Sequence, residues 1–566
     1  MKGVEYLVRM LKAYGVEYIF GIPATANLVF EDAILDQPGI RHVNFHCEWT
    51  ADAAAIGYAT TSHKPAILDG EATHLATHVL RIHDAYAKSI PVIVLAFDKF
   101  TLPDRTFYDY TVNRGIDPIT LFAHITKWRA RCSDVAQLPW CVRRAFNAAT
   151  TGRPGPVLLV ITTGVCKAEI DVEISAEKEC GQFPAYRVTP NLEKANEMAL
   201  LLMKAKKPAI IAGGGVGLSQ ASDELVELAE LIGSPVASTV MAKGQMPETH
   251  PLSVGLVAFG VKAFRKFVTE ADLVLLVGTR SGWEDTMVVP LGVPEKNQKI
   301  IHIDVDPENI GRNYPNTLGM TSDAKLGLQA ILKMLRAKLA KRPLNEFPVV
   351  AEIESIWREH RELLAAAETK AWNNMPISKL RLMKEVRDVL AKDAVIQLAG
   401  GNLVSAQYID LPFYPTTTNM YKGMASGTIT TGFAQIIGGA FAAPDRDAVF
   451  FSGDGSLGYS VSDLETLARY NLRNASLIIA NDSAYGSVKV AQQFMFKRTI
   501  SADFLPINYA KVAESYNCHG IRVEEPNQIK DALRVAFSRE KPTLVDVVTA
   551  DPVTDTDFLA FYSDRI

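Results

Sequence analysis

The sequence predicts an α/β protein of three domains, each with a parallel sheet flanked by helices. Three observations predict this fold. A chain of 566 residues is too long for a single hydrophobic core. Short apolar runs alternate with helical patterns along the chain, which is typical of parallel α/β sheets. Two charged connecting stretches, residues 168–190 and 336–375, divide this alternation into three blocks.

Each block contains several candidate strands. In the first domain, residues 1–170, they are VEYIFGIP, KPAILDG, SIPVIVLAF and GPVLLVI. In the second, residues 188–336, they are PAIIAGGG, ADLVLLVG and KIIHIDVD. In the third, residues 376–550, they are AVIQLAGG, AVFFSGDG, ASLIIAND and PTLVDVV. We expect the first and third domains to share one sheet architecture.

Composition argues against several classes of protein. A net charge of −4 gives no basic surface for nucleic acid or an anionic membrane. No apolar run reaches the roughly 18 residues of a membrane span, so we expect no membrane partner. The first 20 residues alternate charged and apolar types at helical spacing, unlike a signal peptide. The six cysteines form no CxxC pair, which favours a cytoplasmic protein with reduced thiols.

A carboxylate between glycines follows one strand of the third block. AVFF leads into Gly453-Asp454-Gly455-Ser456, and the next strand ends at Asn481. A capped strand-to-helix turn would explain GDGS alone. However, Asp454 and Asn481 lie 481 − 454 = 27 residues apart, about one strand–helix–strand unit. Both side chains should therefore lie at the ligand-binding edge of the sheet. Their oxygens suit Mg²⁺ bound to phosphate, with the Gly455 and Ser456 amides facing the same phosphate.

These residues carry a family resemblance. GDGS, then RYNL at 469–472, then Asn481 resemble the cofactor motif of thiamine-diphosphate-dependent enzymes, in the group of acetolactate synthase, pyruvate oxidase and 2-oxo-acid decarboxylases. Further similar stretches follow in order, at 7–23, 150–161, 271–280 and 300–311, so the resemblance covers nearly the whole chain. It implies a pyrimidine-binding first domain, a Rossmann-like middle domain and a diphosphate-binding third domain. It also implies a homodimer or homotetramer with active sites at the subunit interface.

The resemblance assigns cofactor roles residue by residue. The side chains of Asp454 and Asn481 and the backbone carbonyl of Ser483 match the Mg²⁺ ligands, although Ala480 stands where the family usually has a second Asn. Ile429 matches the apolar wedge that bends the cofactor, and ordinary core packing is the alternative. The other matching positions contact the diphosphate or the pyrimidine: Gly400, Gly401, Asn402, Gly427, Gly453, Gly455 and Ser456.

The resemblance also assigns a catalytic acid. In the family, a Glu after the second strand of the first domain binds N1′ of the cofactor's pyrimidine. This contact promotes loss of the C2 proton from the thiazolium ring. In RHVNFHCEWTADAAAIGYAT, Glu48 stands at the matching place. A surface Glu in the first turn of a helix is the alternative interpretation.

Two loops depart from the family pattern and leave the substrate open. The third-strand loop, usually GPGATN-like, is GEATHLATH at residues 70–78, and the opening loop is ATAN at 24–27. Histidine titrates near neutrality, so side chains in these loops are candidates for substrate contact or proton transfer. Further along the chain, Arg114 stands about where relatives have substrate-facing residues, and arginine binds carboxylates. Helix-surface histidines and a solvated arginine are the alternatives. The candidates are Thr25, Asn27, Glu71, His74, His78 and Arg114.

The resemblance implies a lyase or transferase that cleaves a C–C bond next to a carbonyl. The first hypothesis is decarboxylation of a 2-oxo acid, with the acyl-anion fragment passed to an acceptor, as in a carboligase, or protonated, as in a decarboxylase. The alternative is a non-decarboxylating lyase or hydrolase of a diketone or hydroxy ketone. A non-catalytic member of the fold would be expected to lack Glu48, which is present. The glycine run at 213–217 is a weak nucleotide signal, so FAD in the middle domain stays open.

Overall fold

The computed structural model describes residues 1–98, 117–282, 298–314, 317–398, 401, 403–421, 429 and 432–563. The chain forms two compact units. The first combines Met1–Tyr186 with two segments of the third block, Gly423–Pro444 and Ser460–Leu472. The second contains Arg187–Lys422, Asp445–Tyr459 and Arg473–Ile566. Three parallel six-stranded sheets confirm the predicted fold class, one in the first unit and two in the second.

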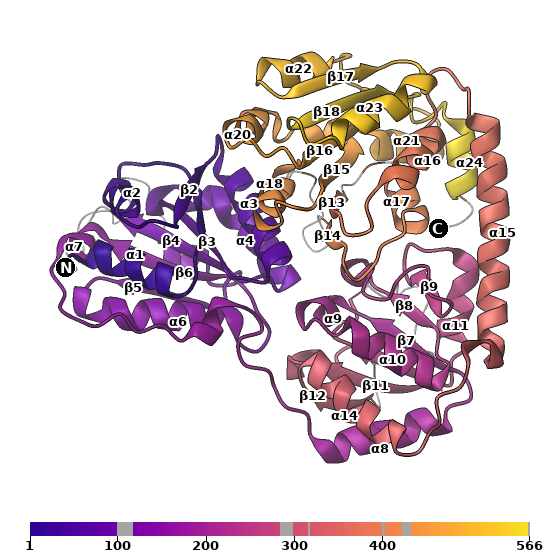
Figure 1. Ribbon diagram of the computed structural model, residues 1–566, viewed down its shortest axis with the longest axis horizontal. Helices are drawn as coiled ribbons and strands as arrows, with labels where there is room; N and C mark the ends of the chain where they lie inside the picture. The colour runs from indigo at the N-terminus through magenta and orange to yellow at the C-terminus, as the bar shows by residue number, and fades with distance from the viewer. Residues whose placement is uncertain are drawn as a thin grey trace. The chain divides into compact units, whose positions relative to one another are not determined.

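The first sheet has the strand order β2-β1-β3-β4-β6-β5. Its central strands are buried on both faces, which explains their continuous apolar runs. Helices α1 (Gly3–Ala13) and α6 (Leu138–Thr150) pack together on one face, and α3 (Glu48–Ser62) contacts α4 (Val79–Lys88) (Figure 1). The strands are β1 (Tyr18–Gly21), β2 (Arg41–Asn44), β3 (Ala66–Glu71), β4 (Val92–Asp98), β5 (Trp128–Cys132) and β6 (Val157–Thr162).

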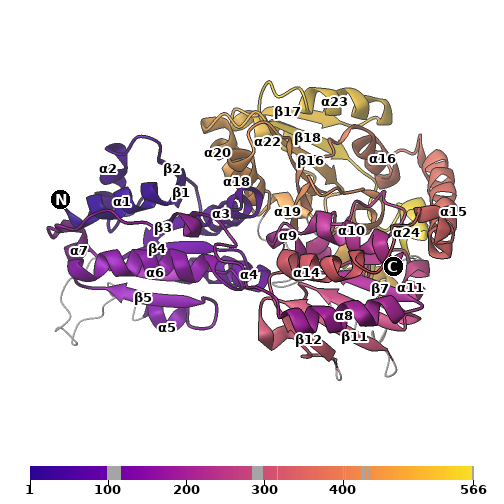
Figure 2. The same ribbon diagram turned by 60° about the horizontal axis from the view of Figure 1, so that its bottom comes forward.

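The second sheet has the order β12-β11-β10-β7-β8-β9, and helices α8, α10 and α14 form one layer beside it (Figure 2). The strands are β7 (Pro208–Ala212), β8 (Val236–Ser238), β9 (Ser253–Leu256), β10 (Leu273–Val277), β11 (Lys299–Asp304) and β12 (Thr317–Thr321). The helices are α8 (Leu192–Lys204), α10 (Ser222–Ile232) and α14 (Ala324–Arg336).

The glycine run that begins α9 (Gly214–Leu218) has a packing role. A Cβ at Gly215 would lie 2.8 Å from the Cα of Gly278, and Gly278 itself has a φ of +58°. The Gly215 amide donates to the Gly278 carbonyl at 2.9 Å. Close approach of two backbones therefore explains these glycines without a nucleotide.

The third sheet has the order β14-β13-β15-β16-β18-β17. Counted from one in each sheet, the first and third orders are both 2-1-3-4-6-5, which confirms the expected shared architecture. Helices α22 (Tyr509–Ser515) and α23 (Ile529–Ala536) pack on its last two strands. The strands are β13 (Val395–Leu398), β14 (Thr418–Tyr421), β15 (Ala448–Gly453), β16 (Ala475–Asn481), β17 (His519–Val523) and β18 (Thr543–Val548).

Two topologically equivalent helices pack against each other inside the first unit. Helix α3 follows the second strand of the first sheet, and α18 (Ala434–Ala442) follows the second strand of the third. A Cβ at Gly57 would lie 2.0 Å from the Gln435 carbonyl oxygen, and one at Gly438 would lie 1.8 Å from that of Ala54. This contact explains why both helices are rich in Ala and Gly.

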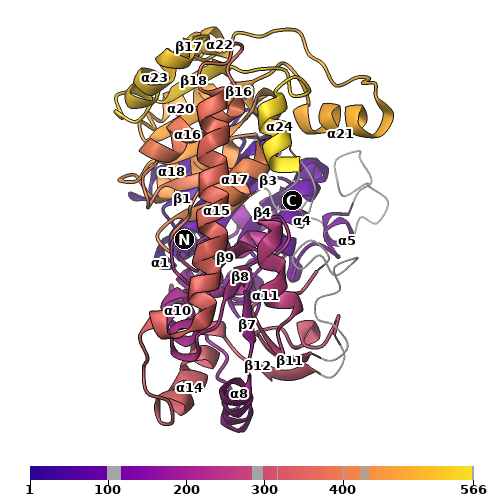
Figure 3. The ribbon, with the colours of Figure 1, turned by 90° about the vertical axis from the view of Figure 1, so that its right-hand side faces the viewer.

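A long helix, α15 (Pro348–Ala371), occupies most of the second charged connecting stretch. Figure 3 shows it running beside elements of the second and third sheets, within one unit. Among the helices that the structure describes, none combines the length and the apolar character that crossing a membrane requires.

Candidate functional site

Asp454 is a buried carboxylate at the carboxyl edge of the third sheet. It begins the short helix α19 (Asp454–Leu457), directly after β15, and is 2% exposed. Its Oδ1 atom is buried and has no hydrogen-bond partner among the described residues. Burial, and then the charge of Asp482, raise the pKa of Asp454 to about 7. A buried carboxylate without a counter-charge is costly, so this position favours a bound cation.

Asn481 lies at the end of the neighbouring strand. β15 and β16 pair in parallel with Gly453 opposite Ala480, which places Asp454 and Asn481 side by side in register. The Asn481 amide nitrogen donates to Asp546 Oδ1 at 2.8 Å and to the Ile507 carbonyl at 2.9 Å. Both bonds engage the side-chain nitrogen of Asn481. Its side-chain oxygen accepts only a long 3.5 Å hydrogen bond from Ser483 Oγ, so it can also bind a cation beside Asp454.

The next acidic residue already has a partner. Asp482 lies 3.2 Å from the ammonium group of Lys379, which is fully buried and also donates to the Ala550 carbonyl. Among the described residues, no basic side chain forms an ion pair with Asp454, in contrast to Asp482. One carboxylate oxygen and one amide oxygen are the hard donors that Mg²⁺ prefers, so these residues fit a magnesium ion.

Several of the residues that we expect to contact the cofactor have features of a site where a ligand lies close to the backbone. Gly401 has a φ of +119°, which only glycine adopts readily. Ser456 is buried, and its hydroxyl has no partner among the described residues. Ile429 is partly buried. Gly400, Asn402 and Gly427 lie outside the described residues.

Glu48 is the first residue of α3 and lies 48 − 44 = 4 residues after Asn44, the last residue of the edge strand β2. Its side chain is 26% exposed, and one oxygen lies 3.9 Å from Nδ1 of His74. The predicted placement after the second strand is therefore observed. A partly exposed carboxylate at a helix start is available to a ligand, and its charge does not destabilise the ligand-free protein because the helix dipole favours it.

A buried ion pair lies one helical turn beyond Glu48. Nδ1 of His78 lies 2.7 Å from Oδ1 of Asp52, and both side chains are at most 2% exposed. Burial acts to lower the pKa of His78, but the Asp52 carboxylate outweighs it and the pKa is raised. His78 is thus not on the helix surface. We did not predict Asp52, although its spacing of four from Glu48 on one helix face was a usable signal.

Replacing His78 by leucine is expected to destabilise the fold by about 3 kcal/mol, because it removes the hydrogen-bonded partner of the buried Asp52 carboxylate. The raised pKa of His78 sets the sign of the pH dependence. The stabilisation is fully present below the unfolded value of about 6.5 and is lost as pH rises through the folded pKa. Urea unfolding at several pH values measures both effects. His83→Leu on α4 is the matched control, and a pH-independent difference would contradict the ion pair.

The opening loop is held by a second hydrogen-bonded group. The Asn27 amide donates to Asp69 Oδ2 at 2.8 Å and its oxygen accepts from the Ala24 amide at 2.7 Å, with the side chain buried. His42 Nε2 lies 2.9 Å from the other Asp69 oxygen. Oxygen or nitrogen atoms of Glu31, His42 and Asp69 lie within 4.8 Å of one another, but Asp69 already accepts at both oxygens. Asn27 therefore holds its own loop in place. Asp69 and His42 were not among the residues that we predicted from the sequence.

The remaining substrate candidates differ in their exposure to solvent. Thr25 is exposed, and its hydroxyl lies 3.4 Å from Oε2 of Glu71, the buried last residue of β3. The His74 side chain is 38% exposed. These two loops therefore meet at the carboxyl edge of the first sheet. Arg114 lies outside the described residues.

The chain is similar in sequence to known proteins over nearly its whole length. Three family profiles match: "Thiamine pyrophosphate enzyme, N-terminal TPP binding domain" over residues 1–104, the "central domain" over 195–331, and the "C-terminal TPP binding domain" over 399–547. A probable acetolactate synthase large subunit of Methanocaldococcus jannaschii is 31% identical, with 97% of this chain and 92% of the relative covered. The acetolactate synthase large subunit of Haemophilus influenzae is 28% identical, covering 97% and 94%. A 2-hydroxyacyl-CoA lyase of Arabidopsis thaliana is 29% identical, covering 96% and 95%.

Proposed function

This chain belongs to the thiamine-diphosphate-dependent enzymes, and from that premise we propose that it decarboxylates a 2-oxo acid and transfers the acyl-anion fragment to an acceptor carbonyl. Thiamine diphosphate and Mg²⁺ are the proposed cofactors. The observation that carries the proposal is the uncompensated, buried carboxylate of Asp454 beside the Asn481 amide oxygen. The acetolactate synthases among the relatives favour ligation over simple protonation of the fragment.

The proposed roles follow from the donors each residue offers. Asp454, Asn481 and the backbone carbonyl of Ser483 hold Mg²⁺, which in turn holds the diphosphate. When bound, the cofactor supplies a carbon nucleophile that attacks a carbonyl. Glu48 would hold a proton at N1′ of the pyrimidine, and the Ile429 side chain would pack against the cofactor. The other proposed contacts to the cofactor come from Gly400, Gly401, Asn402, Gly427, Gly453, Gly455 and Ser456.

Substrate contacts are proposed for Thr25, Glu71, His74 and Arg114. Thr25 and Glu71 already lie close together, and His74 lies beside Glu48. Arg114 would bind a carboxylate through its guanidinium fork. We leave Asn27 out of this set because its amide nitrogen donates to Asp69 of β3 and its amide oxygen accepts from Ala24 in the same loop.

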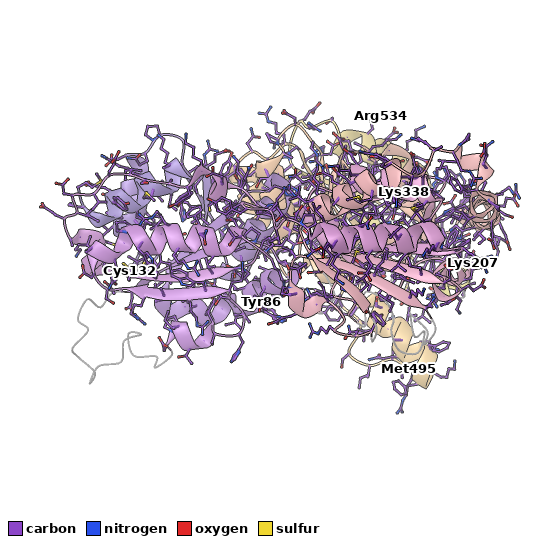
Figure 4. The ribbon with its side chains drawn as sticks, turned by 90° about the horizontal axis from the view of Figure 1, so that it is seen from below. Tyr86, Cys132, Lys207, Lys338, Met495 and Arg534 are labelled. Carbon is purple, nitrogen blue, oxygen red and sulfur yellow. The ribbon has the colours of Figure 1, made fainter. Side chains whose placement is uncertain are left out.

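A second copy of the chain is the proposed partner, in a homodimer or homotetramer with the active site between subunits. Helix α21 (Gly486–Phe496) supports this, because it exposes Phe494, Met495 and Phe496 by 79%, 68% and 62%. Of these three side chains, Met495 is labelled in Figure 4. An exposed apolar patch of this kind is typical of an association surface. All six cysteines are free, which agrees with the proposed cytoplasmic location.

A non-decarboxylating C–C lyase is the second candidate. The altered loop from Glu71 to His78 favours it, as does the 2-hydroxyacyl-CoA lyase among the relatives. That loop places an imidazole beside Glu48, where the family pattern has small residues.

The proposal is tested by incubating the protein with thiamine diphosphate, Mg²⁺ and a panel of 2-oxo acids, diketones and hydroxy ketones. We expect CO₂ release from a 2-oxo acid and a ligated product by mass spectrometry. Chelation of the divalent cation is expected to abolish turnover. Cleavage of a ketone without CO₂ would instead establish the lyase. A yellow purified protein would show that FAD is also bound.

A further inference from the structure

Asp546 is a charged side chain in the middle of an apolar strand of the third sheet. The strand, β18, reads TLVDVV. Asp546 is 0% exposed, like its neighbours Leu544, Val545 and Val547. A carboxylate buried this deeply destabilises a protein unless its oxygens bind hydrogen-bond donors. The donors that surround Asp546 therefore indicate why an acidic residue occupies this strand.

The strand register places Asp546 on the same face of the sheet as the proposed metal ligand Asn481. Strand β18 lies between β16 and β17 (Figure 1). Asn481 of β16 pairs with Val548, and Asp546 lies two residues before Val548, so all three share one face. Arg522 of β17 pairs directly with Asp546. Asn481, Asp546 and Arg522 therefore form a row across three neighbouring strands.

The two oxygens of Asp546 have separate partners. Oδ1 accepts from the side-chain nitrogen of Asn481 at 2.8 Å. Oδ2 accepts from the backbone amide of Tyr509 at 2.8 Å and from Nη1 of Arg522. The same Nη1 atom donates at 3.3 Å to the Ile507 carbonyl, which is the other acceptor for the Asn481 nitrogen. One guanidinium group thus contacts both acceptors that hold this nitrogen.

The oxygen and the nitrogen of an amide side chain have nearly the same shape, so hydrogen bonds decide which way each points. We propose that Asp546 is a positioning residue, which holds the nitrogen of Asn481 and thereby turns the amide oxygen toward a metal ion beside Asp454. An ionised carboxylate only accepts hydrogen bonds, so it excludes the reversed amide. The effect on the metal rests on the proposed function, whereas the orientation of Asn481 does not.

Replacing Asp546 by asparagine changes one oxygen into a donor and keeps the shape of the side chain. Tyr509 and Arg522 both donate to the Oδ2 position, so the new amide oxygen should occupy it. The new nitrogen then faces the nitrogen of Asn481. Either two donors stay in contact, or the Asn481 amide reverses and presents its nitrogen to the metal. Both arrangements weaken the metal site.

The effect on the metal is tested by titrating Mg²⁺ into the full chain in a calorimeter, with thiamine diphosphate present. We expect Asp546→Asn to lower the Mg²⁺ affinity by about tenfold or more, as is usual for a residue that supports a ligand. Asp546→Ala should retain more of the affinity, because the Ile507 carbonyl still accepts from the Asn481 nitrogen and no new donor opposes it.

Urea unfolding of the cofactor-free variants should give the opposite order. The alanine variant should be the less stable one, because it leaves a cavity and loses both hydrogen bonds that asparagine keeps. A residue with only a structural role would make alanine the more damaging change in both measurements. The same order of the two variants in Mg²⁺ affinity and in stability would therefore overturn the positioning role.

Asp323→Asn is the matched control. Asp323 is a buried carboxylate of the same unit, and it also accepts from an arginine, Arg187, and from a backbone amide, that of Leu326. The control should lose stability but keep the Mg²⁺ affinity of wild type. An equal loss of affinity in Asp323→Asn and Asp546→Asn would also overturn the proposal.

The orientation of Asn481 is tested without the cofactor, by introducing Asn481→Asp into wild type and into Asp546→Asn. In wild type the new carboxylate faces that of Asp546, whereas in the variant it accepts from the new amide nitrogen. Urea unfolding should therefore show the larger loss of stability in wild type, as is typical of residues in contact. Equal losses would overturn the orientation. This coupling together with no binding of Mg²⁺ and thiamine diphosphate by wild type would instead contradict the proposed function.

Discussion

Replacing Glu48 by glutamine is expected to slow turnover by roughly 10²–10⁴-fold, the usual contribution of a positioned acid or base. The variant keeps the shape of the side chain but loses its negative charge. It therefore holds a proton at the pyrimidine nitrogen much less well. Calorimetry should show nearly wild-type thiamine diphosphate binding. Hydrogen–deuterium exchange at C2 of the bound cofactor, followed by NMR, should slow together with turnover.

The control for this substitution is Glu17→Gln, which changes an exposed glutamate of the same unit. It should leave both rates unchanged. If Glu48→Gln exchanges C2 as fast as wild type, then Glu48 is only a structural carboxylate. Proton transfer would then be assigned to the loop from Glu71 to His78, which places His74 beside it.

Replacing Asp454 by alanine is expected to abolish cofactor retention. Mg²⁺ would lose the one charged side chain among its proposed ligands. Loss of a residue that only supports a ligand lowers metal affinity by about 10–100-fold, so we expect loss of the ligand itself to lower it further. The same change removes a buried carboxylate that has no ion-pair partner among the described residues but accepts backbone hydrogen bonds, so the cofactor-free variant should lose little or no stability in urea unfolding. Calorimetry with Mg²⁺ and thiamine diphosphate measures the binding loss.

Asp503→Ala, at an exposed carboxylate of the same unit, is the matched control and should retain the cofactor. Tight thiamine diphosphate binding by Asp454→Ala would refute the metal assignment. A strong loss of stability would show instead that the carboxylate has a structural partner.

Mixing the two inactive variants tests the proposed subunit interface. If each site takes Glu48 from one chain and Asp454 from another, half of the sites in a mixed dimer are intact. Coexpression of Glu48→Gln with Asp454→Ala should then restore about a quarter of wild-type activity, because random pairing makes half of the dimers mixed. No recovery from dimers shown to be mixed by mass spectrometry would place both residues of a site on one chain.

Local patterns in the sequence alone determined the parallel sheets and the placement of Asp454 and Asn481 at neighbouring strand ends. Apolar runs between helical patterns predict buried parallel strands, and the 27-residue spacing predicts neighbouring strand ends for Asp454 and Asn481. Such features depend on periodicity and on one strand–helix–strand unit. The same is true of Glu48, whose place at a helix start follows from the residues around it.

The tertiary structure decided which side chains are paired, buried or exposed. The Asp52–His78 ion pair and the hydrogen bond from Asn27 to Asp69 depend on how separate elements pack. The Tyr470 hydroxyl accepts from the Asn44 amide across 426 residues of chain, and α3 owes its small residues to the distant helix α18. Burial is a property of all the segments around a side chain, so no local pattern in the sequence contains it.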